Sequence, residues 1–291
     1  LINKILITGA TGFIGSHLTE YCIEQDYEVV AFDRYNPNNH WGWLENSEYK
    51  DDISIVLGDI RDYDSVSKAM VGCDTVFHLA ALIGIPYSYI SPLAYIRTNV
   101  EGTYNVLEAA KNLNLEQVLI TSTSETYGTV QYAPIDENHP TEPISYYGET
   151  KLQVEKNLKW FSELKGIRFG VLRYFNAAGY DIKGRIKGRE RNALNLIPIA
   201  MEVAAGIREK IQVFGDNYDT HDGTGVRDYI HVSDLADIHV KAAEHLVTNQ
   251  QSTILNCGYG KGFSVKKVLE IANAVNNKPI PVEMGDRRVG D

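Results

Sequence analysis

Cysteine, positive charge and long apolar runs are all scarce in this sequence. Its 3 cysteines among 291 residues (Cys22, Cys73 and Cys257) have spacings that fit neither a disulfide framework nor a metal centre. We therefore expect no bound metal and a reducing, cytoplasmic location. The 28 basic residues are outnumbered by 38 acidic ones, and a net charge of −10 argues against binding to nucleic acid or a membrane surface. No apolar run reaches the length that spans a membrane.

What is present is typical of a globular α/β protein, with 44% hydrophobic and 23% charged residues. The chain enters an apolar run at once and has no initiator Met, so we expect a trimmed start and no signal peptide. Short apolar runs alternate with helical patterns, as a parallel sheet covered on both faces requires. We predict a doubly wound parallel sheet of the Rossmann type with right-handed crossovers. The predicted strands are 4–9, 28–33, 53–59, 75–81, 117–123 and 169–175, and the predicted helices between them are 13–25, 62–70, 94–112 and 147–165.

The pattern changes after Phe175. Residues 179–191 are rich in Gly, Arg and Lys without periodicity, and residues 215–225 are rich in turn formers. We predict a smaller C-terminal region that is interwoven with the first domain instead of following it on a linker. The predicted boundaries are 1–175 and 226–257 for the Rossmann domain, and 176–225 and 258–291 for the smaller region.

A glycine-rich turn, Gly9-Ala10-Thr11-Gly12-Phe13-Ile14-Gly15, follows the first predicted strand and opens the first predicted helix. Glycine permits a tight turn and close approach of the backbone to a pyrophosphate, whose charge sits at the helix N-terminus. Asp33 ends the second predicted strand, where a carboxylate accepts hydrogen bonds from ribose hydroxyls and repels a 2′-phosphate. This favours NAD over NADP, a preference that the neighbouring Arg34 weakens slightly. The predicted NAD contacts here are Gly9, Gly12, Phe13, Ile14, Gly15, Asp33 and Arg34.

Further cofactor contacts are predicted at the carboxyl ends of the later strands, where open α/β sheets bind ligands. Asp59 is placed to take the adenine amino group, and small residues after the fourth strand let a cofactor lie against the backbone. These predicted contacts are Asp59, Ile60, Leu79, Ala80, Ala81, Asn99, Ser122 and Phe175.

Tyr147 and Lys151 are four residues apart in a predicted helix and so lie on one face of it. A phenol is a poor base near neutral pH because its unperturbed pKa is about 10. An ammonium held close favours the phenolate, and we expect Lys151 to do this while also holding the nicotinamide ribose. Thr123 ends the fifth strand, where its hydroxyl can bind the substrate oxygen whose proton Tyr147 removes. Together these side chains predict hydride transfer to NAD with Tyr147 as the proton acceptor.

In combination these motifs resemble the extended short-chain dehydrogenases/reductases, in their nucleotide-sugar epimerase and dehydratase branch, over essentially the whole chain. The resemblance implies that Thr123, Tyr147 and Lys151 take that family's catalytic Ser/Thr, Tyr and Lys roles. It also implies that the cofactor is NAD, held by the glycine-rich turn and Asp33.

Two stretches of the second half, residues 172–179 and 214–232, are similar to UDP-glucose 4-epimerases. The similarity implies that the smaller region binds a UDP-sugar, with arginine forks on the pyrophosphate and an aromatic ring on uracil. The implied substrate contacts are Thr123, Asn176, Asn195, Leu196, Gln212, Phe214, Arg227, Arg288 and Asp291. The basic residues Lys183, Arg185, Lys187, Arg189 and Arg191 either steer the anionic substrate or form a solvated loop.

Three stretches of the first half depart from the epimerase pattern. Residues 78–86 lack the lysine that the epimerases usually carry shortly after the fourth strand. Ser122-Thr123-Ser124-Glu125 is closer to the nucleotide-sugar 4,6-dehydratases and UDP-glucuronate decarboxylases, and the loop Trp41-Gly42-Trp43-Leu44 is also similar to the dehydratases. In a dehydratase a glutamate removes the C5 proton after oxidation at C4, and Glu125 stands at the position of that base. An epimerase needs no such base. Otherwise Glu125 is a carboxylate hydrogen-bonded near the strand end.

We give the second-half motifs more weight because they contact the nucleotide and the sugar. We predict an NAD-dependent UDP-sugar 4-epimerase, acting on UDP-glucose and UDP-galactose by transient oxidation at C4 and return of the hydride to the opposite face. The alternative is a 4,6-dehydratase or UDP-glucuronate decarboxylase with Glu125 as base. A non-catalytic NAD-sensing protein would have lost catalytic side chains that are all present here. The resemblance also implies a homodimer through helices 94–112 and 147–165, with Tyr104 and Trp160 at its seam.

Overall fold

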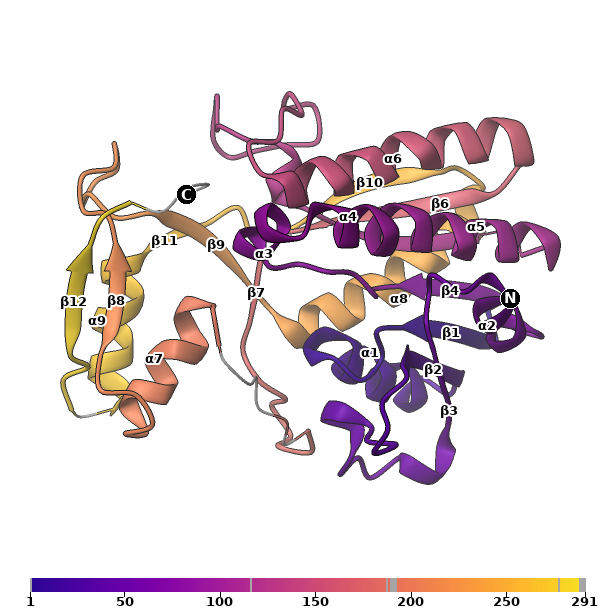
Figure 1. Cartoon of the computed structure of the whole chain (residues 1–291), viewed down its shortest axis with the longest axis horizontal. Coiled ribbons are helices and arrows are strands. Elements are labelled where there is room, and N and C mark those ends of the chain that lie inside the picture. The colour runs from indigo at the N-terminus through magenta and orange to yellow at the C-terminus, as the bar shows by residue number, and fades with distance from the viewer. Residues whose placement is uncertain (1, 116, 187, 189–192, 277, 288–291) are drawn as a thin grey trace. The chain divides into compact units, whose positions relative to one another are not determined.

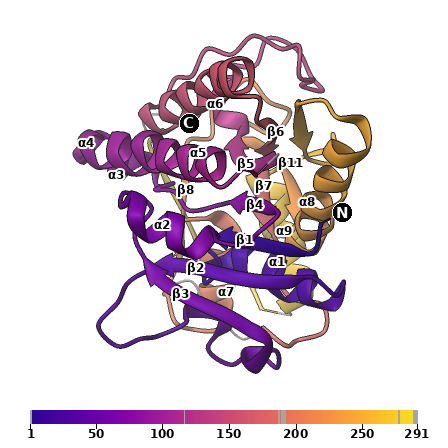
Figure 2. The same cartoon turned by 90° about the vertical axis from the view of Figure 1, so that its right-hand side faces the viewer.

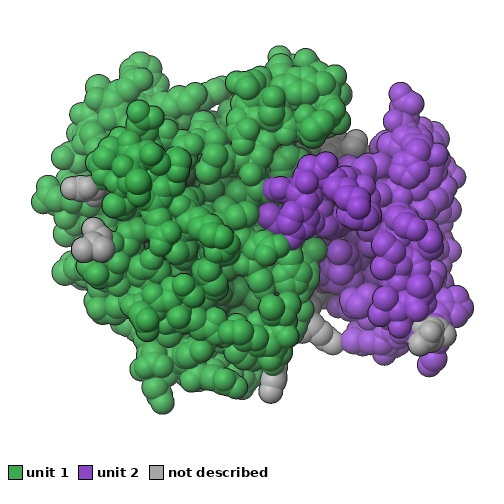
Figure 3. Space-filling model, turned by 180° about the vertical axis from the view of Figure 1, so that it is seen from behind, with its two compact units in different colours: residues 1–188, 231–257 green, residues 189–230, 258–291 purple. Residues whose placement is uncertain are grey.

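The computed structural model describes residues 2–115, 117–186, 188, 193–276 and 278–287, which belong to two compact units (Figure 1). The larger unit spans 1–188 and 231–257, and the smaller spans 189–230 and 258–291 (Figure 3). The units divide at 188 and 231, whereas the sequence predicts boundaries at 175 and 226. The segment after 175 stays with the larger unit because ion pairs attach it to the first helix, as described below. Which unit binds which ligand stays a prediction.

A parallel sheet forms the centre of the larger unit (Figure 2). Within the described residues it has seven strands in the order β10-β6-β5-β4-β1-β2-β3, and all neighbours pair in parallel. The predicted doubly wound fold is confirmed. Chain order reverses between β1 and β4, which is the switch point where such sheets bind ligands. The strands of this unit are β1 (Lys4–Thr8), β2 (Glu28–Arg34), β3 (Ile53–Gly58), β4 (Thr75–His78), β5 (Gln117–Thr123), β6 (Arg168–Tyr174), the short β7 (Asn176–Ala178) and β10 (Thr253–Cys257).

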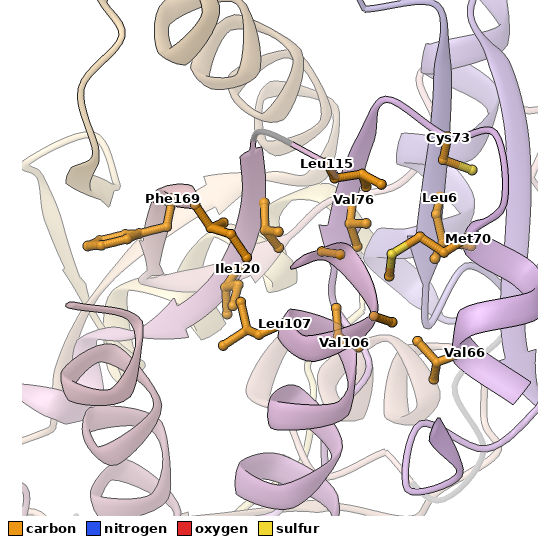
Figure 4. Packing of buried hydrophobic residues seen from close by; sticks show 14 of the residues in the cluster. Leu6, Val66, Met70, Cys73, Val76, Val106, Leu107, Leu115, Ile120 and Phe169 are labelled. Atoms are coloured by element: carbon orange, nitrogen blue, oxygen red, sulfur yellow. The ribbon is translucent and has the colours of Figure 1, made fainter. Parts of the chain in front are cut away.

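Helices cover both faces of this sheet. On one face α2, α5 and α6 pack over a continuous apolar core, and on the other α1 packs beside α8 (Figure 2). Figure 4 shows Val66 of α2 and Val106 of α5 lying over Leu6, Val76 and other strand residues. Burial of these side chains removes apolar surface from water and is the main stabilising contribution to the unit. The helices are α1 (Phe13–Glu24), α2 (Tyr63–Met70), α3 (Ile85–Ile90), α4 (Pro92–Tyr95), α5 (Gly102–Asn112), α6 (Tyr146–Lys165) and α8 (Val232–Asn249).

The predicted helix 94–112 is divided in the structure. It consists of α4, a π-helical turn (Ile96–Glu101) and α5. The π turn carries Asn99, which is 1% exposed. Such turns hold one extra residue per turn and are frequent at functional sites.

The smaller unit is built around its own apolar core. Parallel pairing joins β8 to β12, antiparallel pairing joins β9 to β11, and two helices pack on the β8 side through residues such as Ala200 and Leu269. No helix in the part of the chain that the structure describes is long and apolar enough to cross a membrane. The elements are α7 (Leu196–Ala204), β8 (Ile211–Phe214), β9 (Val226–His231), β11 (Gly262–Ser264), α9 (Val265–Asn276) and β12 (Val282–Gly285).

Candidate active site

The glycine-rich turn lies where β1 meets α1, with Phe13 and Ile14 in the first turn of the helix. Gly9 has a φ of +74°, and a Cβ at Gly15 would lie 2.1 Å from the carbonyl oxygen of Gly9, so only glycine fits there. The first turn of α1 contains no acidic residue, and no side chain caps its amides. The helix start therefore presents backbone N–H groups and positive dipole to an anion, which fits the pyrophosphate of NAD.

Asp33 lies beside this turn, near the end of β2. Its Oδ2 accepts hydrogen bonds from the amide and hydroxyl of Thr11 at 2.7 and 2.6 Å, and its Oδ1 accepts one from the amide of Arg34 at 2.6 Å. The side chain of Arg34 is exposed. The carboxylate therefore holds the turn in shape, a role the sequence did not indicate, in addition to its predicted contact with the ribose.

The segments after β3 and β4 lie at the same edge of the sheet. Ala80 packs against the turn so closely that a Cβ on Gly9 would lie 3.0 Å from its nitrogen, as the small residues there predict. The predicted strand 75–81 ends at His78, and beyond it Leu79 and Ala80 donate their amide hydrogens to the carbonyl and hydroxyl oxygens of Thr8.

Two of the polar residues predicted to contact the cofactor, Asp59 and Asn99, form hydrogen bonds with other groups of the protein. Asp59 accepts hydrogen bonds from the guanidinium of Arg61, which lower the pKa of its carboxyl. The amide of Asn99 donates to the carbonyl of Leu82 at 2.9 Å and accepts from its nitrogen at 2.8 Å, and it also donates to the hydroxyl of Thr150 at 3.2 Å. Asn99 thus fixes the loop after β4 to α6. Direct contacts of either residue with a cofactor stay predictions.

The predicted catalytic side chains lie together at the end of β5 and the start of α6. Ser145 caps α6 by accepting a hydrogen bond from the amide of Gly148 at 3.1 Å, which places Tyr147 in the first turn. Thr123, Tyr147 and Lys151 are 7%, 8% and 6% exposed, so all three lie within a desolvated site. A hydrogen bond joins Tyr147 to Thr123.

The charges of these groups are set mainly by burial. Burial raises the pKa of Tyr147 above its ordinary value, the hydrogen bond with Thr123 opposes that rise, and the charge of Glu125 adds to it. Burial likewise lowers the pKa of Lys151 to about 8, while the charge of Glu155 opposes that change. The ammonium of Lys151 donates to the carbonyl of Thr121 at 2.8 Å. The predicted lowering of the Tyr147 pKa is therefore outweighed by desolvation.

A buried ion pair lies one helical turn beyond Lys151, and no sequence pattern indicated it. Arg173 of β6 donates to both carboxylate oxygens of Glu155, at 3.0 and 2.6 Å, and the two side chains are 5% and 3% exposed. Ser122, a predicted cofactor contact, donates to the same carboxylate at 2.5 Å. The pair therefore links β5, β6 and α6 directly behind the catalytic group.

Glu125, the base of the alternative reaction, lies beside Tyr147, whose pKa its charge raises. Its carboxylate accepts a hydrogen bond from Ser145 at 3.5 Å, and it is half-buried. The remaining predicted cofactor contacts are Ile60, buried against Gly102 after β3, and Phe175, which follows β6 and donates its amide hydrogen to the carbonyl of Cys257.

The predicted substrate contacts are divided between the units. Asn176 begins β7 in the larger unit. In the smaller unit Asn195 precedes α7, Leu196 begins it, Gln212 and Phe214 lie on β8, and Arg227 lies on β9. Arg288 and Asp291 lie outside the described residues. Also in the smaller unit, the guanidinium of Arg287 lies 4.1 Å from the centre of the Tyr218 ring and donates to Asn217 at 2.7 Å.

Where the structure describes the basic segment it is a loop in which Lys183 is exposed and Arg185 is half-buried. Lys183 and Arg185 both form ion pairs with Glu24 of α1, and Arg185 also pairs with Asp181. These pairs compensate part of the positive charge of the segment, and its predicted steering of a substrate stays a prediction. Lys187, Arg189 and Arg191 lie outside the described residues.

Comparison with known proteins agrees with this geometry. A model of the NAD dependent epimerase/dehydratase family matches residues 5–258. A UDP-glucose 4-epimerase of Halalkalibacterium halodurans is 42% identical over 289 residues, which are 99% of this chain and 84% of the relative. The structure of UDP-glucose 4-epimerase from Brucella ovis in complex with NAD matches with a TM-score of 0.89 and 36% identity, covering 99% of this chain and 87% of that one. The UDP-glucose 4-epimerase from Bifidobacterium longum, in complex with NAD+ and UDP, gives a TM-score of 0.89 and 33% identity over 99% and 88% of the two chains. The predicted resemblance is confirmed, and the chain belongs to the NAD dependent epimerase/dehydratase family.

Proposed function

We propose that this protein is an NAD-dependent UDP-sugar 4-epimerase that interconverts UDP-glucose and UDP-galactose. The observation that carries the proposal is the buried group of Thr123, Tyr147 and Lys151 at the same edge of the sheet as the glycine-rich turn. Similar proteins named UDP-glucose 4-epimerase match nearly the whole chain and supply the substrate class.

In this proposal the glycine-rich turn and the start of α1 hold the pyrophosphate of NAD, and Asp33 holds the adenine ribose. Bound NAD would supply a hydride acceptor for C4 of the sugar and, once reduced, a hydride donor toward the opposite face, and its oxidised nicotinamide ring would add a positive charge to the site. Lys151 binds the nicotinamide ribose. Ser122 and Phe175 border the nicotinamide end.

Tyr147 carries the proton of the reaction. Its phenolate oxygen accepts the proton of the 4-hydroxyl as the C4–H bond breaks, and returns it when the ketone is reduced on the other face. Thr123 holds the same oxygen through its hydroxyl. Positive charge near Tyr147 favours its phenolate and opposes the effect of burial on its pKa. Lys151 contributes that charge in the protonated form, which predominates below its pKa of about 8.

We assign the UDP group to the smaller unit. Arg227 is exposed on β9, as a phosphate-binding guanidinium requires, and Phe214 at the end of β8 is placed to stack on uracil. In the smaller unit this set is completed by Asn195, Leu196, Gln212, Arg288 and Asp291. The larger unit contributes the two remaining predicted substrate contacts, Thr123 and Asn176.

A cytoplasmic location and a homodimer belong to the same proposal. All three cysteines are free and buried, which suits a reducing compartment. Tyr104 of α5 and Trp160 of α6 are 49% and 62% exposed, and such apolar surface suits an interface with a second copy.

The test is incubation of the purified protein with UDP-glucose, UDP-N-acetylglucosamine or UDP-glucuronate, with the products identified by NMR. We expect UDP-galactose from UDP-glucose, and one equivalent of NAD released on denaturation. A 4-keto-6-deoxy sugar would instead identify a dehydratase, and a pentose product from UDP-glucuronate a decarboxylase, each with Glu125 as base. Tyr147→Phe is the matched control, because it removes only the hydroxyl.

A further inference from the structure

Two segments outside the predicted cofactor contacts lie against α1 of the larger unit. Residues 41–47 follow β2 and residues 180–186 follow β7; together we call them the clasp. The ring of Trp43 lies 5.2 Å from that of Phe13, the first residue of α1, and 6.0 Å from that of Tyr180. Aromatic rings at such centroid separations attract each other. The two segments are thus joined to each other and to the start of α1 by contacts between tilted aromatic rings.

The surroundings of Trp43 fix its position. A Cβ on Gly188 would lie 2.1 Å from the indole, and the carbonyl of Gly188 accepts a hydrogen bond from the hydroxyl of Tyr180 at 2.6 Å. His17, 5% exposed, completes the group with its ring 6.3 Å from both Trp43 and Tyr180. This tight packing leaves Trp43 little freedom to move while the clasp is closed.

Charged groups attach the clasp to the rest of α1. Arg185 pairs with Asp181 at 3.0 Å, with Glu20 at 3.5 Å and with Glu24, and its side chain is 15% exposed. Glu20 is fully buried, and its other oxygen accepts a hydrogen bond from Ser47 at 2.7 Å. Side chains from both segments of the clasp therefore bind carboxylates of α1.

The clasp also bonds to the glycine-rich turn. The amide of Trp43 donates to the carbonyl of Thr11 at 2.9 Å. Gly42, with a φ of +56°, approaches so closely that a Cβ there would lie 2.5 Å from the same oxygen. Thr11 is the residue whose amide and hydroxyl bind Asp33. The clasp therefore contacts the turn that is proposed to hold the pyrophosphate.

We propose that the clasp retains the dinucleotide, and that its opening, controlled by Trp43 and Arg185, sets the rate of cofactor release. This inference rests on NAD being the cofactor of the proposed function. An epimerase removes a hydride and returns it to the same sugar, so its cofactor must stay bound between the two half-reactions. A closed clasp beside the turn provides that retention.

The experiment measures cofactor exchange without any sugar. Protein loaded with NAD is mixed with a large excess of etheno-NAD, a fluorescent analogue, and the rate at which NAD leaves is followed by the appearance of bound analogue. Trp43→Ala and Arg185→Met should each release NAD at least about tenfold faster, because each loses contacts worth about a factor of ten in an equilibrium constant. Tyr132→Ala, which removes an exposed ring that contacts His139 at 4.8 Å, and Arg208→Met, an arginine of the smaller unit, are the matched controls and should exchange at the wild-type rate.

Folding of each variant is checked by thermal unfolding of the cofactor-free protein. If a clasp variant fails to fold, Gly188→Ala serves instead, because its methyl group displaces the Trp43 ring without removing a buried side chain. Wild-type release from folded clasp variants that bind NAD would overturn the inference and leave the proposed function intact. A wild-type protein that takes up no NAD would refute both.

Discussion

Replacing Glu155 with glutamine should destabilise the protein by about 3–5 kcal/mol, the range found when one partner of a buried ion pair is removed. Arg173 would then keep a full positive charge at 4% exposure with no carboxylate beside it. The amide oxygen that replaces the carboxylate can still accept one hydrogen bond, and Arg173 keeps its hydrogen bond to the hydroxyl of Tyr127 at 2.9 Å and its contact with the face of that ring at 4.7 Å. None of these neutralises the charge. Ser122 would also lose a charged acceptor at 2.5 Å.

A double variant that removes both charges separates the effect of the unpaired charge from the effect of packing. In a double variant, Glu155→Met with Arg173→Met, no charge is left unpaired, and two apolar side chains of similar length fill the space. Such replacements are often neutral or stabilising by about 1–4 kcal/mol. We therefore expect the double variant to be more stable than Glu155→Gln alone.

Urea unfolding is the assay, because urea is uncharged and does not screen the pair. With a slope of about 3 kcal/mol per molar urea, the expected loss moves the midpoint down by about 1 M or more. Glu163→Gln makes the same charge change at an exposed position of α6 and should stay within about 0.5 kcal/mol of wild type. A loss below about 1 kcal/mol for Glu155→Gln, or a double variant as unstable as the single one, would refute the reasoning.

Four further predictions concern the turn and the catalytic group. Tyr147→Phe should lower kcat about 10²–10⁴-fold while bound NAD, measured after denaturation, is unchanged. Glu125→Gln removes a charge that raises the pKa of Tyr147, so the limb of the pH–rate profile governed by Tyr147 should shift to lower pH with 4-epimerisation retained; loss of epimerisation would contradict this. The pKa of Lys151 is lowered from 10.5 to about 8 on folding, so its destabilising effect is complete below pH 8 and disappears as pH rises to 10.5. Lys151→Met should therefore stabilise the cofactor-free protein by up to about 3 kcal/mol at pH 7 and much less at pH 10, as measured by urea unfolding. Gly15→Ala places a methyl group 2.1 Å from the carbonyl of Gly9 and should reduce stability by about 1–3 kcal/mol and weaken NAD binding in a titration.

The Rossmann core was predictable because its signals are local. The strands of a parallel sheet are buried on both faces, so apolar runs such as 117–123 stand out, and that strand has the predicted bounds. The glycines of the turn are recognisable because only that residue fits at Gly15. By contrast, the positioning role of Asn99 could not be predicted. It depends on hydrogen bonds to Leu82 and Thr150, and the helical period of the sequence does not reveal such partners.

The clasp and the buried ion pair could not be predicted for a related reason. Arg185 meets Glu24 across 161 positions, and Arg173 meets Glu155 across two different elements. A run of basic residues is the same sequence pattern whether its charges face solvent or a helix. The pKa of Tyr147 was misjudged because the spacing of two residues carries no information about desolvation, which is its largest cause. The substrate contacts of the smaller unit came from family resemblance alone and stay predictions.

The π-helical turn between α4 and α5 restricts how the length of this chain can change. Asn99 in the turn must face Leu82, whereas Val106, about two turns later, must face the apolar core. The extra residue of the turn lets one helix meet both demands. Deleting a single residue there would restore a regular helix but rotate everything after it by about 100°, so one of the two contacts would be lost. At this place the number of residues is constrained more strictly than their identity, and related chains should vary by substitution but not by insertion or deletion.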